Sequence, residues 1–423
     1  MTSYEKVINF LEKSRVSKLG LGRIKQLLEY FDNPQEKLKI VHVSGTNGKG
    51  SFSSMLSSVL YQAGYCIGYF SSPSITTVND SFRINCKTVS DELFTSVMEK
   101  VIEKACNMQD KPTEFELLTA AAFQMFFECK CDICIIECGL GGDKDSTNII
   151  LSPILSVITN IQMDHCQILG NTIEGIARHK SGIIKKNCPV LYGGEDNEAL
   201  EIIKNKAYEM SSKLYVTDFQ SLSNEKYSLE GTEFSFGKYQ NLKTHLLGMY
   251  QIYNAANVLT AIEILHENGY KISEQSIYEG FEKCSWHGRF EVMCHNPVVI
   301  FDGAHNPEGL SSAVKSIKHY FDGQLVVFLI GVMADKEYEL YGEMLQDIAD
   351  MIFSVTPDNP RALNCKILCD SFKSRGLNVQ PSESFSDGVS DAFKYAQKKN
   401  IPFIALGSLY MYNEFKMILK KLK

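Results

Sequence analysis

Short apolar runs alternate with helix-like stretches along almost the whole sequence, and this alternation constrains the fold more than any other feature. Four runs read as buried strands, and amphipathic or apolar helical stretches separate them: "KIVHVSG" (39–45), "YCIGYFSSP" (65–73), "CDICIIECG" (131–139) and "ILSVITNI" (154–161). Such alternation predicts an α/β fold with a doubly wound, mostly parallel sheet. Ligands of such folds gather at the carboxyl ends of the strands.

The alternation restarts near Pro297, which predicts a second, smaller α/β domain of Rossmann-like type and about 130 residues. Its first strand is "VVIFDG" (298–303), and its last, "IPFIALGS" (401–408), leads into a final helix. We therefore divide the chain into residues 1–293 and 294–423, with a hinge close to the boundary.

Turn and cap residues predict where several elements end. Gly64 is expected to end the helix that follows the first strand, and Ser90 is expected to cap the next one. The residues between them, 74–89, read as a loop. Asn171, with Glu174 three residues on, predicts the start of a later helix.

Charge and hydropathy exclude several classes of partner. The formal net charge of −7 is spread along the chain, which argues against nucleic acid or an acidic membrane surface. The longest apolar run, 325–334, is far shorter than the ~20 residues of a membrane span. The first residues include no apolar export segment, so the sequence predicts a cytoplasmic protein.

Thirteen scattered cysteines indicate reduced thiols and not a disulfide framework. Cys129, Cys131, Cys134 and Cys138 form the one local cluster. A zinc site would usually need ligand pairs on turns, whereas the last two of these cysteines lie within an apolar run that reads as a buried strand. Packed thiols are the favoured interpretation.

A glycine-rich stretch, "VHVSGTNGKGSFSS" (41–54), joins the first strand to a helix. Backbone N–H groups of such a loop bind phosphate at the N-terminus of the helix, although an ordinary tight turn would also use glycine. Lys49 would add a positive charge and Ser51 a hydroxyl for phosphate or Mg²⁺. The stretch departs from the common nucleotide-loop spelling, because Gly50 separates these two residues. The predicted phosphate-binding residues are Thr46, Asn47, Gly48, Lys49, Gly50 and Ser51.

Oxygen-bearing side chains lie at the ends of two other, neighbouring predicted strands. Ser72 and Glu137 are candidate Mg²⁺ ligands, because Mg²⁺ prefers oxygen and keeps several waters. A buried Glu137 would be costly without a cation, but an exposed glutamate at a strand end remains the alternative. His165 fits either a second metal ion or a hydrogen-bonded core histidine.

Four further residues could contribute to chemistry. Lys180 in "ARHKSGIIKK" is, taken alone, most simply a solvated lysine. Asp302 and His305 lie at a strand end in the second domain, and Arg289 could clamp a phosphate.

These motifs together resemble the folylpolyglutamate synthase and dihydrofolate synthase family, the folate branch of the Mur-type ATP-dependent amide ligases. The resemblance covers the chain from Leu19 to about Tyr410. It rests on motifs in the family's order: "SGTNGKGS", "SSP", "ECGLGG…DSTN", "NIQMDH…LG", "IARHKSGIIK", "QIYNAANVL", "GRFEV", "FDGAHNPEG", "GVMADK", "TPDNPRAL" and "GSLY".

The resemblance implies that ATP phosphorylates a substrate carboxylate and that the amine of L-glutamate attacks the acyl phosphate, with release of ADP and phosphate. The substrate would be a folate and, in a bifunctional enzyme, also dihydropteroate. The implied cofactors are ATP and Mg²⁺, with K⁺ left open. Residues 1–293 would form the ATP-binding domain with a folate-binding N-terminal segment, and residues 294–423 the glutamate-ligase domain. A monomer suits such a chain.

The resemblance also implies roles for individual residues. Lys180 matches a lysine that the family typically carbamylates, and Lys49, Lys180 and His305 are the expected catalytic group. Ser72, Glu137 and His165 would serve Mg²⁺, while Asn254, Arg289 and Asp302 would contact the nucleotide. The expected substrate contacts are Leu19, Gly20, Leu21, Gly22, Arg23, Phe115 and Glu116 for the folate or pteroate, and Ser408, with His305, for glutamate.

Some positions depart from the family pattern. Ser74, Ser81, Asp143, Lys144, Tyr250 and His287 replace other residue types. None of them removes a phosphate or metal ligand, so ATP chemistry is expected to survive. Two of them, Ser74 and Ser81, fall in the loop expected to meet the substrate. A cell-wall amide ligase of the same fold and a catalytically silent folate-binding paralogue are the alternatives.

Overall fold

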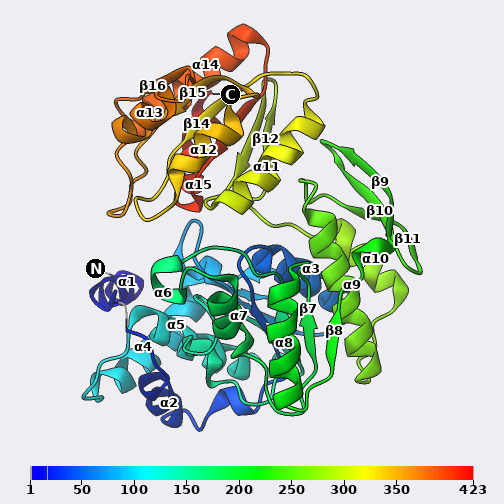
Figure 1. Cartoon of the computed structure of the whole chain (residues 1–423). Helices are drawn as coiled ribbons and strands as arrows, with labels where there is room; N and C mark the ends of the chain where they lie inside the picture. Colours follow the sequence, from blue (N-terminus) through cyan, green and yellow to red (C-terminus); the bar gives the residue numbers. More distant parts are fainter. Residues whose placement is uncertain (1, 17, 423) are drawn as a thin grey trace. The chain divides into compact units, whose positions relative to one another are not determined.

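A computed structural model describes residues 2–16 and 18–422, which form two compact units (Figure 1). Unit 1 comprises Met1–Ser223, Phe236–Leu242 and Tyr253–Cys284. Unit 2 comprises Asn224–Ser235, Lys243–Ile252 and Ser285–Lys423. Each unit is therefore assembled from several stretches of chain, and each is described by itself.

Unit 1 is built on an eight-stranded sheet in the order β4-β3-β2-β5-β1-β6-β7-β8. All neighbours are parallel except β2–β3 and β3–β4. This confirms the predicted doubly wound, mostly parallel fold. The strands are β1 (Ile40–Ser44), β2 (Ile67–Phe70), β3 (Phe82–Ile84), β4 (Lys87–Thr88), β5 (Ile133–Glu137), β6 (Leu155–Ile158), β7 (Val190–Tyr192) and β8 (Leu214–Val216).

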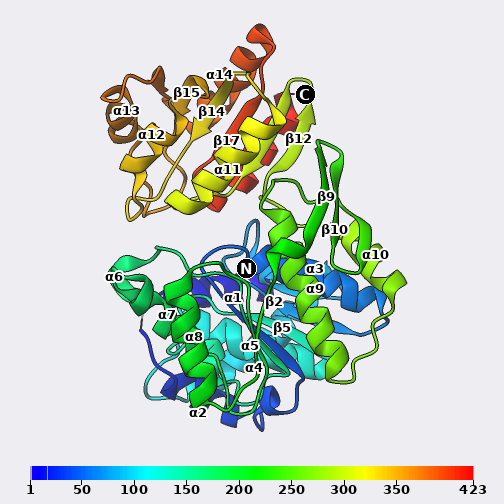
Figure 2. The ribbon, with the colours of Figure 1, turned by 45° about the vertical axis from the view of Figure 1, so that its right-hand side comes forward.

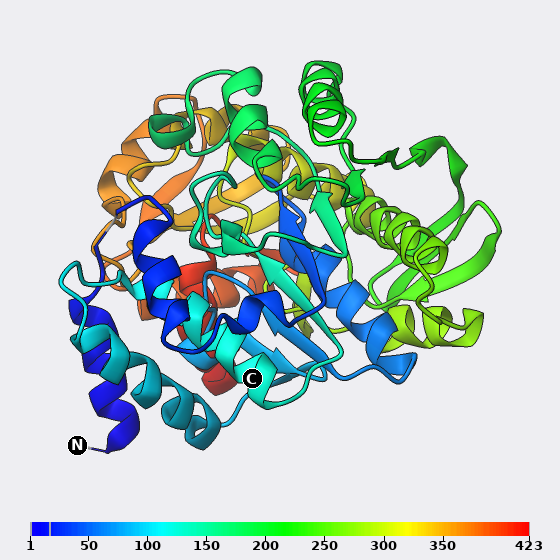
Figure 3. The ribbon, with the colours of Figure 1, turned by 90° about the horizontal axis from the view of Figure 1, so that it is seen from below.

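Helices cover both faces of this sheet, because its central strands are buried on both sides (Figure 2). On one face, α1, α2, α4 and α5 enclose an apolar core, and the dark blue α1 packs against α4 (Figure 3). On the other, α3 contacts β1, β2 and β5, and α10 packs against α3. The helices of unit 1 are α1 (Ser3–Lys13), α2 (Gly22–Glu29), α3 (Lys49–Gln62), α4 (Asp91–Cys106), α5 (Glu114–Glu128), α6 (Cys166–Leu169), α7 (Ile173–Ser181), α8 (Asn197–Glu209), α10 (Glu274–Lys283) and most of α9 (Gln251–Glu267).

Local signals placed some boundaries correctly and others not. Ser90 caps α4, and Gly64, with φ +91°, follows the end of α3. The predicted loop 74–89 is wrong in part, because it contains β3 and β4, which extend the sheet in antiparallel fashion. The helix predicted at Asn171 is capped instead by Thr172, whose hydroxyl accepts from the Gly175 N–H at 3.0 Å.

Unit 2 holds a six-stranded sheet in the order β12-β13-β17-β14-β15-β16, parallel except for β12–β13. The second α/β domain is therefore confirmed as an architecture. Its strands are β12 (Glu291–His295), β13 (Val298–Asp302), β14 (Val326–Ile330), β15 (Ala349–Ser354), β16 (Val379–Pro381) and β17 (Phe403–Leu406), and its helices are α11 (Pro307–Tyr320), α12 (Tyr341–Leu345), α13 (Cys365–Lys373), α14 (Phe385–Lys399) and α15 (Tyr412–Leu422).

A further three-stranded sheet was not predicted. Its strands are β9 (Leu222–Ser228), β10 (Gly231–Phe236) and β11 (Tyr239–Thr244), in the order β11-β10-β9. The β9 sequence "LSNEKYS" is mostly polar and exposed, so it lacks the apolar run that marks the other strands.

The described residues contain no disulfide bond, no metal-binding cluster and no membrane-spanning helix. No disulfide bond joins the cysteines within residues 2–16 and 18–422, and no group of three or more His, Cys, Asp or Glu side chains there could hold a metal ion. Cys131, Cys134 and Cys138 are buried, and Cys129 is partly buried. No helix of this described part has the length and apolar character needed to cross a membrane.

Candidate functional site

The glycine loop between β1 and α3 closes against the segment that follows β6. The Thr46 N–H donates to the Asn160 carbonyl at 3.1 Å, and the Asn47 N–H donates to the Asn160 side chain at 2.8 Å. The Thr159 hydroxyl donates to the Asn47 carbonyl at 2.7 Å. These bonds occupy the first N–H groups of the loop, so a phosphate would meet the first turn of α3, where N–H groups lack partners within the helix.

Two glycines of this loop have conformations and neighbours that exclude a side chain. Gly45 has φ +151°, and a Cβ there would lie 1.9 Å from Thr159 Oγ1. Gly48 has φ +84°, and a Cβ there would lie 2.4 Å from Asn254 Oδ1. The structure therefore brings the predicted nucleotide residue Asn254, from α9, against the loop, and both positions require glycine.

Two lysines converge on one carbonyl of the loop. Lys49 Nζ and Lys180 Nζ each donate to the Gly45 carbonyl at 2.8 Å, and Lys49 also donates to the Thr46 carbonyl at 3.2 Å. Lys180 is buried, so its reading as a solvated lysine is wrong. Burial, followed by the charge of Lys49, lowers the pKa of Lys180 to about 7.

This pKa predicts a dependence of stability on pH. In the unfolded chain Lys180 has its ordinary pKa near 10.5, whereas the folded pKa is about 7. Between these values the unfolded state binds one more proton, so the free energy of unfolding rises with pH by up to about 1.4 kcal/mol per pH unit. Lys180→Met should remove this slope in urea unfolding between pH 7.5 and 9.5 in CO₂-free buffer.

The matched control is Lys204→Met on α8, because Lys204 is exposed and should keep the wild-type slope. A Lys180→Met protein with the same slope as wild type would contradict the lowered pKa.

The predicted Mg²⁺ ligands lie at the carboxyl edge of the sheet of unit 1. Glu137 is the last residue of β5 and is buried, and Ser72 lies in the loop after β2. The Tyr69 hydroxyl donates to Glu137 Oε1. A buried carboxylate and a hydroxyl at strand ends fit Mg²⁺, which takes oxygen ligands and fills its remaining positions with water and phosphate.

His165 fits a Mg²⁺ site less closely than Glu137 and Ser72 do. Its side chain is 40% exposed, and its Nε2 lies 3.8 Å from the Asp164 carboxylate. It has φ +53° and precedes the short helix α6, whereas Lys180 lies on the next helix, α7. An exposed histidine of this kind excludes the core-histidine reading.

A buried polar network beneath this edge was not predicted. His42 Nε2 lies 2.9 Å from Thr147 Oγ1 and 3.3 Å from Cys138 Sγ, and burial lowers the pKa of His42 to about 3. Asp145 accepts from the Thr147 N–H and the Leu140 N–H. The network fixes the segment after β5, and only its motif "DSTN" marked it in the sequence.

Several residues expected near the folate form hydrogen bonds or ring contacts within unit 1. Arg23 Nε donates to Glu116 Oε2 at 2.9 Å, and Glu116 also caps α5 by accepting from the Thr113 N–H. Phe115 stacks on Phe70 with ring centroids 5.9 Å apart. The structure therefore brings Arg23 and the start of α5 together.

In unit 2, Asp302 ends β13 and accepts three hydrogen bonds. The donors are the Tyr250 hydroxyl at 2.7 Å, the Phe290 N–H at 2.9 Å and the Ala304 N–H at 2.7 Å. Tyr250, one of the departures from the family pattern, thus holds this carboxylate. Burial raises the pKa of Asp302.

The other predicted residues of unit 2 lie on the segments next to Asp302. Arg289 Nη1 donates to the Gly288 carbonyl at 3.1 Å. A Cβ added to Gly303 would lie 2.4 Å from the same Nη1 atom, so Arg289 packs closely against Gly303. His305 Nδ1 lies 2.9 Å from the Gly303 carbonyl. Ser408 follows β17, the neighbour of β13, and its hydroxyl accepts from the Tyr410 N–H.

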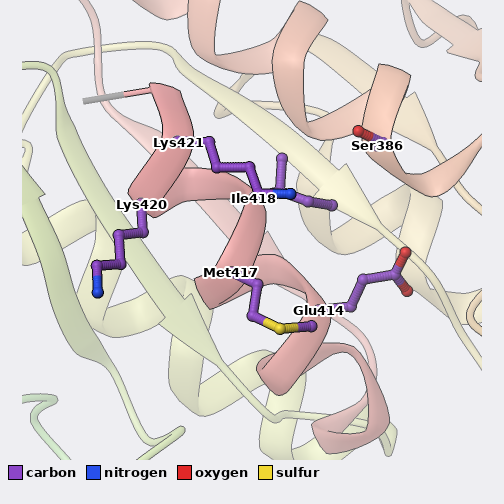
Figure 4. A pocket seen from close by; sticks show the side chains of 6 residues that line it. All are labelled: Ser386, Glu414, Met417, Ile418, Lys420 and Lys421. Carbon is purple, nitrogen blue, oxygen red and sulfur yellow. The ribbon is translucent and has the colours of Figure 1, made fainter.

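A surface pocket on unit 2 contains none of the predicted site residues. It lies between α14 and α15 (Figure 4) and is lined by Ser386, Glu414, Met417, Ile418, Lys420 and Lys421.

Two family models match the sequence. The model described as Mur ligase middle domain matches residues 43–262, and the model described as Mur ligase, glutamate ligase domain matches residues 288–408. A curated relative, the dihydrofolate synthase/folylpolyglutamate synthase of Bacillus subtilis, is 37% identical over 95% of this chain and 95% of its own. The chain belongs to this family of Mur-type ligases.

Solved structures agree with this assignment. The crystal structure of folylpolyglutamate synthase from Thermotoga maritima matches with a TM-score of 0.86 and 32% identity, covering 100% of this chain and 97% of that one. E. coli FolC in complex with DHPP and ADP matches with a TM-score of 0.86 and 25% identity, covering 100% and 98%. The resemblance read from the motifs is confirmed, and the cell-wall and silent alternatives are not favoured.

Proposed function

We propose that this protein is an ATP-dependent ligase that joins L-glutamate to a folate, and also to dihydropteroate, through an acyl phosphate. The convergence of Lys49 and Lys180 on the Gly45 carbonyl, beside a glycine loop that opens α3, is the observation that carries this proposal. The loop follows the carboxyl end of β1, and ligands of parallel sheets gather at that end of the strands.

In the first step, a carboxylate oxygen of the acceptor attacks the γ-phosphorus of ATP and ADP leaves. Such transfer depends on positioning and charge neutralisation, for which Lys49, Ser51 and the first turn of α3 are placed. In the second step, the amine nitrogen of glutamate attacks the acyl carbon, loses a proton and displaces phosphate, which leaves an amide bond. Mg²⁺ would neutralise phosphate charge, with Ser72, Glu137 and His165 as its proposed protein ligands.

Lys180 is the residue that we propose to be carbamylated. Only a neutral amine reacts with CO₂, and the pKa of about 7 leaves much of Lys180 neutral at physiological pH. The product is an anion, so the reaction would reverse the charge of this buried side chain.

The remaining proposed contacts divide by ligand. Asn254, Arg289 and Asp302 would contact the nucleotide, His305 and Ser408 would contact glutamate, and Leu19–Arg23 with Phe115 and Glu116 would lie near the folate or pteroate. Residues 1–293 would thus supply ATP and folate binding and residues 294–423 the glutamate-ligase part, in a cytoplasmic monomer.

The proposed function predicts a strict dependence of ADP release on both co-substrates. ADP formation is measured with dihydropteroate or tetrahydrofolate, each with and without L-glutamate. We expect sustained turnover only when an acceptor and glutamate are both present. Turnover with a muropeptide acceptor and none with either pterin would overturn the proposal.

A further inference from the structure

Tyr69 is a tyrosine in a short buried strand, and its side chain ends in a polar hydroxyl group. It lies in β2, "IGYF", and its side chain is 2% exposed. A buried tyrosine hydroxyl requires a hydrogen-bond partner, because an unpaired one would lose its bonds to water. Here the hydroxyl donates to Oε1 of Glu137.

The sheet register places these two residues on one face. Tyr69 pairs with Ile135 across the parallel β2–β5 ladder, and Glu137 lies two residues beyond Ile135. Because side chains alternate along a strand, Ile135 and Glu137 point to the same face as Tyr69. Figure 2 shows β2 and β5 beside each other.

Tyr69 also connects Glu137 to the loop that follows β2. The chain runs from Tyr69 through Ser71 to Ser72, the other proposed oxygen ligand. On its other side, Tyr69 pairs with Arg83 of β3. A single phenol therefore links the two strand ends from which the proposed Mg²⁺ ligands come.

We propose that Tyr69 is a positioning residue that fixes the orientation of the Glu137 carboxylate for a divalent cation, an inference that rests on the proposed function. A carboxylate offers about four lone-pair positions, and the phenol occupies one of them. The hydrogen bond restricts rotation of the carboxylate and so fixes the directions in which its lone pairs point. Partners that orient a metal ligand in this way are worth about 10- to 100-fold in metal affinity.

The test is the affinity of the ADP-bound protein for Mn²⁺, measured from the electron paramagnetic resonance signal of free Mn²⁺ without any acceptor or glutamate. Mn²⁺ takes the same oxygen ligands as Mg²⁺. Tyr69→Phe should raise the Kd for Mn²⁺ by about tenfold. Because no catalysis is measured, a failure here differs from a failure of the proposed function, which concerns acceptor-dependent ADP release.

The matched control is Tyr192→Phe. Tyr192 is also buried in this sheet, but its hydroxyl lies 3.4 Å from the Asp196 carbonyl and contacts no proposed ligand. Its removal should leave the Kd for Mn²⁺ unchanged. An unchanged Kd in Tyr69→Phe, or an equal rise in both variants, would overturn the inference.

A double variant separates positioning through Glu137 from an independent effect. If Tyr69 acts through Glu137, then Tyr69→Phe should raise the Kd little once Glu137→Gln is present. If the two losses multiply, Tyr69 does not act through Glu137 and the inference is wrong.

Discussion

Lys49→Met is expected to lower glutamate-dependent ADP formation by about 1000-fold, because the variant loses the charge proposed to neutralise the transferred phosphate. The ammonium already lies at the loop, bonded to the Gly45 and Thr46 carbonyls, so it needs little reorganisation to reach phosphate. The loss should appear mainly in kcat at saturating ATP. Steady-state ADP release with tetrahydrofolate and L-glutamate measures it.

The structure supplies a control and a second readout for this variant. Lys204→Met removes an exposed lysine from α8 and should leave kcat unchanged. Because the charge of Lys49 helps to lower the pKa of Lys180, Lys49→Met should also raise the pKa of Lys180. A Lys49→Met enzyme that keeps a tenth or more of wild-type kcat would contradict the proposed role.

Gly45→Ala is expected to lower ADP affinity by about 100-fold, equivalent to about 2.7 kcal/mol. Gly45 has φ +151°, and its added Cβ would lie 1.9 Å from Thr159 Oγ1, so the loop and the segment after β6 must separate. Backbone strain and overpacking together should also lower the free energy of unfolding by about 3 kcal/mol. Calorimetric titration with ADP and urea unfolding measure the two effects.

Gly64→Ala separates strain from the clash at the loop. Gly64 also has a positive φ, +91°, but a Cβ there would meet nothing within 4 Å. This control should lose about 1 kcal/mol of stability and keep wild-type ADP affinity. Equal ADP affinities in the two variants would show that the loop does not depend on a glycine at Gly45.

Much of the fold followed from patterns that are local in sequence. Apolar runs of strand length separated by helical stretches predicted both parallel sheets, because burial on both faces requires such runs. The same logic failed for β9, which is polar and exposed, and for β3 and β4, which are very short strands at one end of the sheet. Strands at an edge are set by their neighbour's hydrogen bonds and leave a weak signal.

Some residues of the candidate site were also predictable from the sequence, whereas others were not. Lys49, Glu137 and Ser72 were identifiable as candidates because each lies at or shortly after the end of a predicted strand, where parallel sheets bind ligands. Tyr69, Thr159 and Asn160 were missed because their roles depend on contacts across the sheet. Lys180 was misread because a lysine in a helix reveals its burial only when the helix is packed.

The sequence by itself determined the alternation of elements, the position of the candidate phosphate-binding loop and the family, since all three depend on residue type and order along the chain. The tertiary structure alone decided which side chains meet. Lys180 and Lys49 share one carbonyl although 131 positions separate them, and Tyr69 reaches Glu137 from another strand. The pKa of Lys180 and the orientation of Glu137 arise from burial and from neighbours brought by folding, and neither cause is local in the sequence.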